Sequence, residues 1–177
     1  IVPLGRVGRL PLPMEQRAEA AEMLAAAKAT TGLELVTPSN AAIGRYNHAL
    51  YKAIAPKGRQ WYCMPLVMAC TVKGHRLDIM ALAIRGSVLE MRRQARLHSE
   101  HMCYLRGCWT ATAREAAADF HGPVRQMRGL LQDFKWKWPH PDVIVNDQGM
   151  QMRWLEVPKA WLMHEIRSSF MRTMVKR

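Results

Sequence analysis

The chain has 177 residues, and its 26 Lys and Arg against 14 Asp and Glu give a formal net charge of +12. Hydrophobic residues make up 49% of the sequence, which is enough for a packed core and argues against wholesale disorder. No apolar run approaches the roughly 18 residues of a membrane-spanning helix, and the length suits one domain or one domain with a small appendage.

The first half of the chain is predicted to be helical after an irregular start. Residues 1–13 hold three prolines and two glycines, which favours an extended lead-in. Residues 14–28 are rich in Ala, Glu and Leu, which predicts a helix. The segment Thr37–Asn40 offers an N-cap for a second helix that ends before Pro56. Residues 61–72 are compatible with a strand, although Pro65 favours a short buried helix.

A long amphipathic helix is predicted from Ile79 to Leu97, with Asp78 as its cap. Gly86 within it costs up to about 1 kcal/mol relative to Ala, so it predicts a close helix crossing. The helix has an apolar stripe and a basic side. The apolar stripe contains Ile79, Leu82, Ala83, Gly86, Leu89 and Arg93, and the basic side contains Arg85, Arg92 and Arg96.

The second half predicts a mixed module. Residues 98–110 indicate a linker, residues 111–120 a short Ala-rich helix, and Pro123 the first residue of a helix that runs to about residue 134. Alternating apolar residues on both sides of the turn at 146–149 predict a β-hairpin, and Pro158 opens a terminal helix. The fold class is therefore mainly α with a small β-hairpin (α+β): a helical bundle followed by a small C-terminal α+β module.

The candidate metal and thiol sites are weak. Cys63, Cys70, Cys103 and Cys108 form no CxxC pair, which favours reduced, buried thiols in an intracellular protein over a disulfide framework. His98 and His101 lie near two of these cysteines, but the spacing matches no common zinc site. No metal or other cofactor is predicted.

A metal-dependent nuclease is a minor alternative. Asp142 and Glu156 flank the predicted hairpin, and Lys159 follows, whereas two carboxylates and a lysine form the core of such enzymes. The nuclease motif places its acid and lysine two residues apart on one strand, so that they share a face. Here the spacing is three, and Pro158 interrupts the strand. A turn at Asp142 and a helix start at Pro158 explain the pattern better.

The surplus of positive charge predicts a polyanionic partner, and RNA or DNA is the commonest. The basic residues cluster in separate segments, where they are candidates for phosphate contacts. Trp136 and Trp138 alternate with lysines, so they could stack on bases, but packing into the core is favoured because both share one face of a strand. The predicted nucleic-acid-binding residues are Lys57, Arg59, Lys73, Arg76, Arg92, Arg93, Arg96, Lys135 and Lys137.

Several spaced segments resemble the C-terminal region, downstream of the polymerase core, of LINE-type non-LTR retrotransposon reverse transcriptases of algal protists. The resemblance covers the chain from about residue 12, and one departure is Ile79, where the family usually has proline. The matching positions are Ala49–Arg59, Cys63, Val72–Asp78, Leu89–Arg93, Gly122–Val124, Leu130, Leu131, Trp136–Pro139, Pro141 and Asp147–Gly149.

This resemblance implies a thumb-like helical region over 14–97, a linker over 98–110 and an accessory module over 111–177. It implies a non-catalytic role in holding template and primer, because the family's catalytic aspartate pair lies upstream and this chain contains no Asp-Asp pair. The start at Ile1 suggests a processed product or a piece of a longer reading frame. It also keeps open a domesticated structural subunit of a larger ribonucleoprotein or organellar complex, with other protein subunits as partners. The expected compartment is the nucleus for a retrotransposon protein, or an organelle for the alternative.

Overall fold

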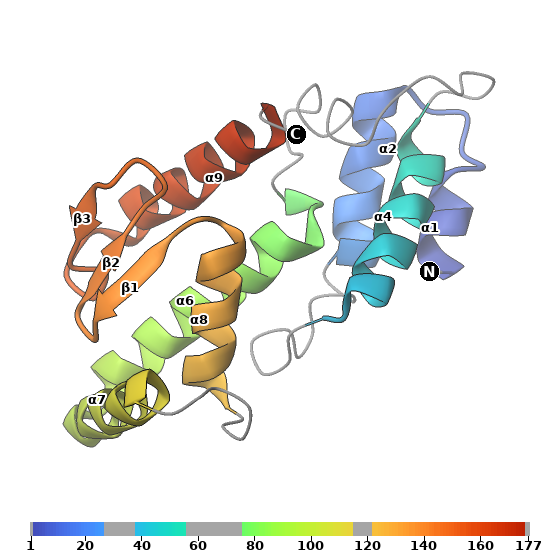
Figure 1. Cartoon of the computed structure of the whole chain (residues 1–177). Coiled ribbons are helices and arrows are strands. Elements are labelled where there is room, and N and C mark those ends of the chain that lie inside the picture. Colours follow the sequence, from blue (N-terminus) through green and yellow to red (C-terminus); the bar gives the residue numbers. More distant parts are fainter. Residues whose placement is uncertain (1, 27–37, 56–75, 115–121, 176–177) are drawn as a thin grey trace. The chain divides into compact units, whose positions relative to one another are not determined.

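The structure is a computed structural model that describes residues 2–26, 38–55, 76–114 and 122–175 (Figure 1). These residues form two compact units. Unit 1 contains residues 2–26, 38–55, 76–82 and 170–175, and unit 2 contains residues 83–114 and 122–169. The predicted fold class is confirmed, because the chain is mostly helical with a small three-stranded antiparallel sheet near its C-terminus. The ambiguous segment 61–72 lies outside the described residues.

Unit 1 begins with a short helix, α1 (Val2–Val7), where the sequence predicts an extended lead-in. Leu4 and Val7 lie one turn apart and are both buried, so tertiary packing outweighs the prolines and glycines of this segment. Gly8 follows the helix and touches α4 (Asn40–Ile54), because a Cβ built on Gly8 would lie 3.2 Å from the Cα of Ala53. The glycine therefore permits the close approach of the two backbones.

The two predicted helices of unit 1 are confirmed. The first consists of α2 (Met14–Ala21) and a π-helical continuation, η1 (Glu22–Ala26). The second, α4, begins after Ser39, whose Oγ accepts a hydrogen bond from the backbone N–H of Ala42. Arg17 of α2 is buried and donates to the carbonyl of Ala55, which is the C-cap residue of α4. Helix α2 thus satisfies a carbonyl that the end of α4 leaves free.

Tyr46 of α4 gives unit 1 a predicted pH dependence. Burial, and then the negative charge of Asp78, raise the pKa of the Tyr46 hydroxyl from 10.0 to about 12. The folded state therefore favours the neutral phenol, and its stability should be complete below about pH 10 and fall as the pH rises towards 12. We expect one of the four tyrosines to ionise late in a titration followed by tyrosinate absorbance. The late transition should disappear in Tyr46→Phe, and its persistence there would contradict the assignment.

Unit 2 is built on α6 (Ile79–Leu97), which starts within unit 1 and confirms the predicted long helix. Its cap is the predicted one, because Oδ1 of Asp78 accepts hydrogen bonds from the backbone N–H groups of Met80 and Ala81 at 2.9 Å each. The predicted apolar stripe is confirmed only in part. Ile79 and Ala83 are buried as predicted, whereas Leu82, Gly86 and Leu89 are half-buried and Arg93 is exposed. The buried residues of α6 are Ile79, Ala81, Ala83, Ile84, Ser87, Val88, Met91, Arg92 and Ala95.

Residues 98–110 are not the predicted linker, because they belong to a regular helix, α7 (Ser99–Arg114). Few residues of α7 are buried, and Leu105 is one of them, so the apolar periodicity that would announce a helix is weak. Helix α7 packs on α8 (Pro123–Asp133), which starts at Pro123 as predicted. Arg128 of α8 joins the two helices, because its guanidinium lies 4.6 Å from the ring centroid of Trp109 and donates to the Trp109 carbonyl.

Helix α8 ends in a turn that leads directly into the sheet. Lys135 has a φ of 61°, the left-handed conformation that usually favours glycine at this position. The N–H of Trp136 donates to the carbonyl of Leu131, and the N–H of Lys135 to that of Gln132, which closes the helix. The strands β1 (Lys137–His140), β2 (Val143–Val145) and β3 (Gln151–Met152) follow in that spatial order. The predicted hairpin is therefore extended by a third strand, β1.

The sheet is fixed by three tryptophans and one asparagine. Trp136, Trp138 and Trp154 are buried, which confirms the predicted core packing of Trp136 and Trp138 and leaves Lys135 and Lys137 exposed. Asn146 accepts from the N–H groups of Gln148 and Met150, which forms the predicted turn. Its Nδ2 donates to Glu165 of α9 (Lys159–Val175), so the turn is tied to the predicted terminal helix.

In the part of the chain that the structure describes, none of the helices combines the length and apolar character needed to cross a bilayer.

Candidate nucleic-acid interface

Unit 2 carries a cavity of about 580 Å³ beside the second half of α6, which we call the arginine cavity. Four cationic side chains and one carboxylate surround it, so it has a surplus of three positive charges. Its wall on α6 is made of residues three or four positions apart, which places them on one side of the helix. The lining residues described are Gly86, Leu89, Glu90, Arg92, Arg93, Arg96, Leu97 and Lys159.

Glu90 is already engaged within the protein. Its carboxylate accepts two hydrogen bonds from Arg93, at 2.5 and 2.8 Å, and one from Gln94 at 2.8 Å. Those hydrogen bonds, first from Arg93 and then from Gln94, lower the pKa of Glu90 from 4.5 to about 2. Glu90 therefore remains ionised at neutral pH and offsets one cation, Arg93, of the four.

Arg92 and Arg96 connect α6 to the segment that leads into α9. Arg92 donates through Nη2 to the carbonyl of Val157, and Arg96 donates through Nη2 to the carbonyl of Leu155. Because a helix advances about 6 Å over four residues, the two guanidiniums reach carbonyls two residues apart in the turn before Pro158. These contacts place Lys159, the first residue of α9, at the edge of the arginine cavity.

Arg92 is a charge without a matching anion among the described residues. The residue is only 4% exposed, and its Nε and Nη1 are buried with no hydrogen-bond partner. Burial, and then the charge of Arg96, lower the pKa of its guanidinium. A buried, unsatisfied cation is costly unless something compensates it. The arginine cavity is therefore electrostatically complementary to an anion that the described residues do not provide.

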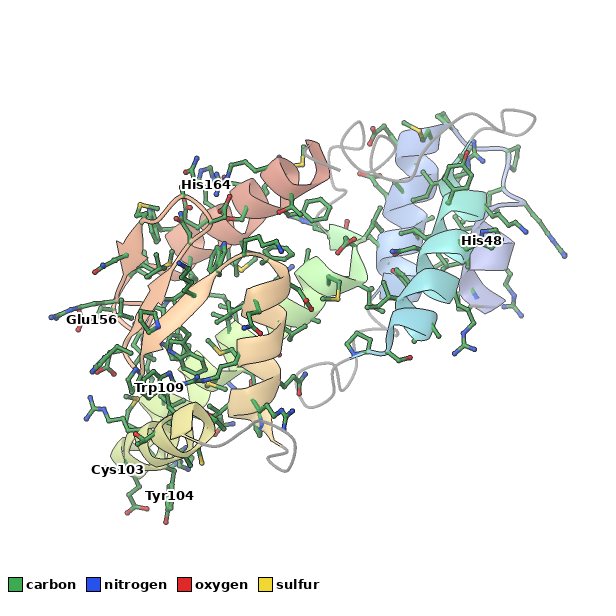
Figure 2. The ribbon with its side chains drawn as sticks, viewed as in Figure 1. His48, Cys103, Tyr104, Trp109, Glu156 and His164 are labelled. Atoms are coloured by element: carbon green, nitrogen blue, oxygen red, sulfur yellow. The ribbon has the colours of Figure 1, made fainter. Side chains whose placement is uncertain are left out.

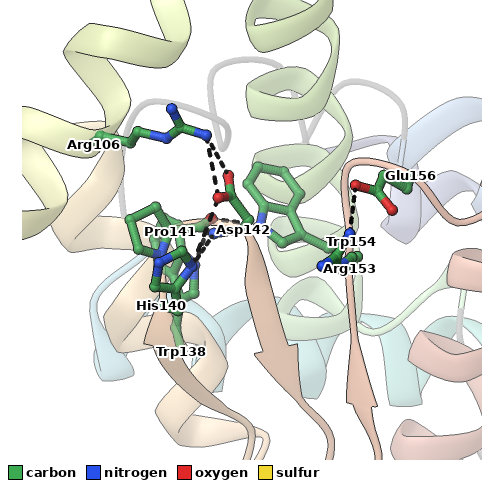
Figure 3. A network of polar contacts seen from close by, with 8 residues as sticks. All are labelled: Arg106, Trp138, His140, Pro141, Asp142, Arg153, Trp154 and Glu156. Atoms are coloured by element: carbon green, nitrogen blue, oxygen red, sulfur yellow. Dashed lines mark hydrogen bonds and ion pairs between the residues drawn. The ribbon is translucent and has the colours of Figure 1, made fainter.

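A second cavity of about 360 Å³, the ion-pair cavity, shares Arg96 with the first. It is formed by the end of α6, α7, the sheet and the turn after β3. Figure 3 shows that each of its carboxylates faces an arginine. Asp142 pairs with Arg106 at 3.2 Å, and Glu156 pairs with Arg153 at 3.4 Å. The ion-pair cavity is thus closer to neutrality than the arginine cavity, although its cations extend the basic surface.

The same geometry bears on the nuclease alternative. Asp142 and Glu156 do line one cavity, but Lys159 lines the other, so the three residues do not form a single site. Both carboxylates are held by arginines, and Asp142 also lies 3.7 Å from Nδ1 of His140. Among the described ranges, no three His, Cys, Asp or Glu side chains are grouped so that they could hold a metal ion.

Cys103 and Cys108 are exposed free thiols on α7, so the expectation that they are buried is wrong. Figure 2 shows Cys103 and Tyr104 pointing away from the helix, and Tyr104 is 70% exposed. His98 and His101 contact each other, with ring centroids 4.9 Å apart. The helical conformation explains the error, because a cysteine in a linker with its own packing could be buried, whereas one on the outer side of α7 is not. Cys63 and Cys70 lie outside the described residues.

The predicted binding residues are distributed over several places. Arg92, Arg93 and Arg96 come together in the arginine cavity. Arg76 belongs to unit 1, where it pairs with Glu22 at 3.2 Å. Lys135 and Lys137 are exposed at the start of the sheet and line neither cavity. Lys57, Arg59 and Lys73 lie outside the described residues.

Sequence reasoning missed Lys159 as a partner of the α6 arginines. Lys159 stands 63 positions after Arg96, and only the contact between α6 and the turn at 155–157 brings the two into one cavity. The available signal was local: Lys159 directly follows Pro158, so it occupies the first turn of a helix and projects from a fixed position. Arg106 and Arg153 of the ion-pair cavity were missed for the same reason.

Comparison with known proteins gives no relative from which a function could be transferred, because the chain matches no protein-family model, no curated protein and no solved structure.

Proposed function

We propose that this chain is a non-catalytic nucleic-acid-binding protein region, and that unit 2 holds the phosphate backbone at the arginine cavity. The observation that carries the proposal is the surplus of three positive charges around one cavity, including an arginine that is buried with two unpaired donors. A polyanion neutralises such a surplus of positive charge. Basic side chains that contact nucleic-acid phosphates also displace the counterions condensed on them, and the release of these counterions favours binding. Arg96 would continue the contact towards Arg106 and Arg153 in the ion-pair cavity.

The resemblance to LINE-type reverse transcriptases supports the same proposed function, binding of a nucleic-acid backbone. The segment after the polymerase core in that family is expected to hold template and primer through their backbones. Leu89–Arg93, one of the resembling segments, forms part of the wall of the arginine cavity. We therefore propose that the cavity contacts the template or primer backbone of such a protein, without a catalytic role of its own.

A salt series tests this function directly. A labelled single-stranded oligonucleotide is titrated with the 177-residue chain between roughly 50 and 300 mM salt, and the logarithm of affinity is plotted against that of salt concentration. Each phosphate contact contributes about 0.7 to the slope for single strands. Arg96→Gln together with Lys159→Gln should therefore reduce the slope by about 1.4.

The matched control removes two lysines elsewhere on unit 2. Lys135→Gln together with Lys137→Gln deletes the same charge from exposed positions outside both cavities. We expect a smaller change of slope than for the cavity pair. Equal changes would show that binding follows net charge alone, and a flat salt response of the unmodified chain would refute nucleic-acid binding.

A structural subunit of a larger complex is the second candidate. It is favoured by apolar side chains that are exposed on the described surface, namely Met23 and Leu24 of η1 and Tyr104 of α7. Isolation of the chain in a stable stoichiometric complex that protects these side chains, together with no salt-dependent affinity for nucleic acid, would favour this candidate over the first.

A further inference from the structure

The arginine cavity is not lined by cations alone, and its apolar part carries an inference that rests on the proposed function. Gly86, Leu89 and Leu97 contribute to the wall, together with the aliphatic parts of the arginine and lysine side chains. Leu97 is 54% exposed at the end of α6, so its apolar surface is accessible in the cavity. A phosphate alone would not use these apolar surfaces.

Gly86 provides the second observation. It lies in the interior of α6, where glycine costs about 1 kcal/mol relative to Ala. The close helix crossing predicted from it is absent among the described residues, because a Cβ placed on Gly86 meets no heavy atom within 4 Å. Neither the packing of the described residues nor a positive φ requires a glycine at this position. Its effect is to leave the space above the helix open at the arginine cavity.

We propose that the arginine cavity takes an unpaired base of single-stranded nucleic acid. The base lies over Gly86 and against Leu89 and Leu97, while the flanking phosphates meet Arg93, Arg96 and Lys159. The volume of about 580 Å³ falls within the range of roughly 300–1,000 Å³ for small-molecule sites, so one nucleotide can enter. A base held in a duplex is stacked and paired, so it cannot reach the apolar wall while the backbone contacts the rim.

The test compares strands that differ only in their bases. The probe is a labelled oligonucleotide of roughly ten nucleotides, prepared as RNA and as DNA, beside strands that carry abasic sites and keep every phosphate. We expect the abasic strands, and a duplex of the same sequence, to bind about tenfold more weakly in at least one of the two chemistries, because they lose the burial of a base against the apolar wall. The slope against salt should not change between intact and abasic strands.

A protein variant tests the same site from the other side. Gly86→Leu fills the open space, improves helix propensity, and should weaken binding of the intact strand about tenfold while leaving the affinity for the abasic strand nearly unchanged. The matched control is Gly107→Leu, because Gly107 also lies in a helix, α7, with open space around it and lines neither cavity. This control should bind like the unmodified chain.

The outcomes separate this inference from the proposed function. Equal affinity for intact and abasic strands in both RNA and DNA, with the salt dependence retained, would overturn base insertion and leave backbone binding intact. Equal affinity for duplex and single strand would overturn it as well. If the chain bound none of the strands, both the insertion of a base and the proposed nucleic-acid-binding function would be refuted. The abasic comparison uses the unmodified chain, so it decides the matter even if Gly86→Leu fails to fold.

Discussion

Replacing Arg92 with methionine is expected to weaken nucleic-acid binding about 10- to 100-fold without destabilising the protein. Arg92 acts here through its charge, because its Nε and Nη1 are buried and its Nη2 donates to Val157. The loss of affinity corresponds to about 1.5–3 kcal/mol, the Coulomb attraction between unit charges roughly 6–10 Å apart at an effective dielectric constant of about 20. Stability should respond in the opposite sense. The substitution removes a buried cation with two unpaired donors and retains an unbranched apolar chain of similar length, so the free energy of unfolding should stay constant or rise by up to about 2 kcal/mol.

The comparison variant for this prediction is Arg93→Met. Arg93 lines the same cavity, but it is exposed and its ion pair with Glu90 lies at the surface. Surface ion pairs contribute little to stability, so its unfolding free energy should hardly change, while affinity falls. Unfolding by urea and binding by fluorescence anisotropy measure the two quantities. Destabilisation of Arg92→Met by more than about 2 kcal/mol would contradict this prediction, because it would show that the contact with Val157 stabilises the fold by more than the buried, unpaired donors of Arg92 cost.

Replacing Trp136 with alanine should destabilise unit 2 by about 3–5 kcal/mol. The side chain is 1% exposed, and its Nε1 donates to Oγ of Ser169 on α9 at 2.9 Å. Ser169 donates in turn to Asp147 in the turn between β2 and β3. The substitution thus leaves a cavity in the core and also removes one of the hydrogen bonds that link α9 to the region of the sheet.

Trp136→Phe separates these two contributions. Phenylalanine keeps most of the buried ring but has no donor for Ser169, so the expected loss is smaller than for alanine, about 1–3 kcal/mol. Denaturant unfolding followed by far-UV circular dichroism measures both variants. A loss below about 1 kcal/mol for Trp136→Ala would contradict the position of this side chain in the core. Because Lys159 starts α9, we also expect weaker nucleic-acid binding in the alanine variant.

Local signals predicted much of the helical structure. Asp78 and Ser39 are capping residues, and Pro123 marks a helix start, so these three positions were recognisable from residue type alone. Asn146 and Gly149 likewise carry the chemistry of their turn, and Gly149 has a φ of 83°. Each of these features depends on neighbours within about four residues, which a sequence displays directly.

The errors arose where distant packing decides. Leu4 and Val7 become helical because their burial against other helices outweighs a proline- and glycine-rich composition. Arg92 was assigned to the basic side of α6, opposite the apolar stripe, whereas it is buried and bonded to Val157. The presence of a basic residue at a helical position does not indicate whether a carbonyl 65 positions later in the chain will accept a hydrogen bond from it. The arginines that α6 contributes to the arginine cavity were therefore predictable from the sequence, whereas the contribution of Lys159 from α9 was not.

The contacts of Arg92 with Val157 and of Arg96 with Leu155 reduce the conformational entropy that the protein can lose when it binds a ligand. They hold the turn before α9 in place at two points, so the wall that carries Lys159 is set before any ligand arrives. A preorganised site loses less conformational entropy on association than one that must order its loops. Under the proposed function, most of the entropic loss on binding a flexible strand would therefore fall on the strand and little on the protein.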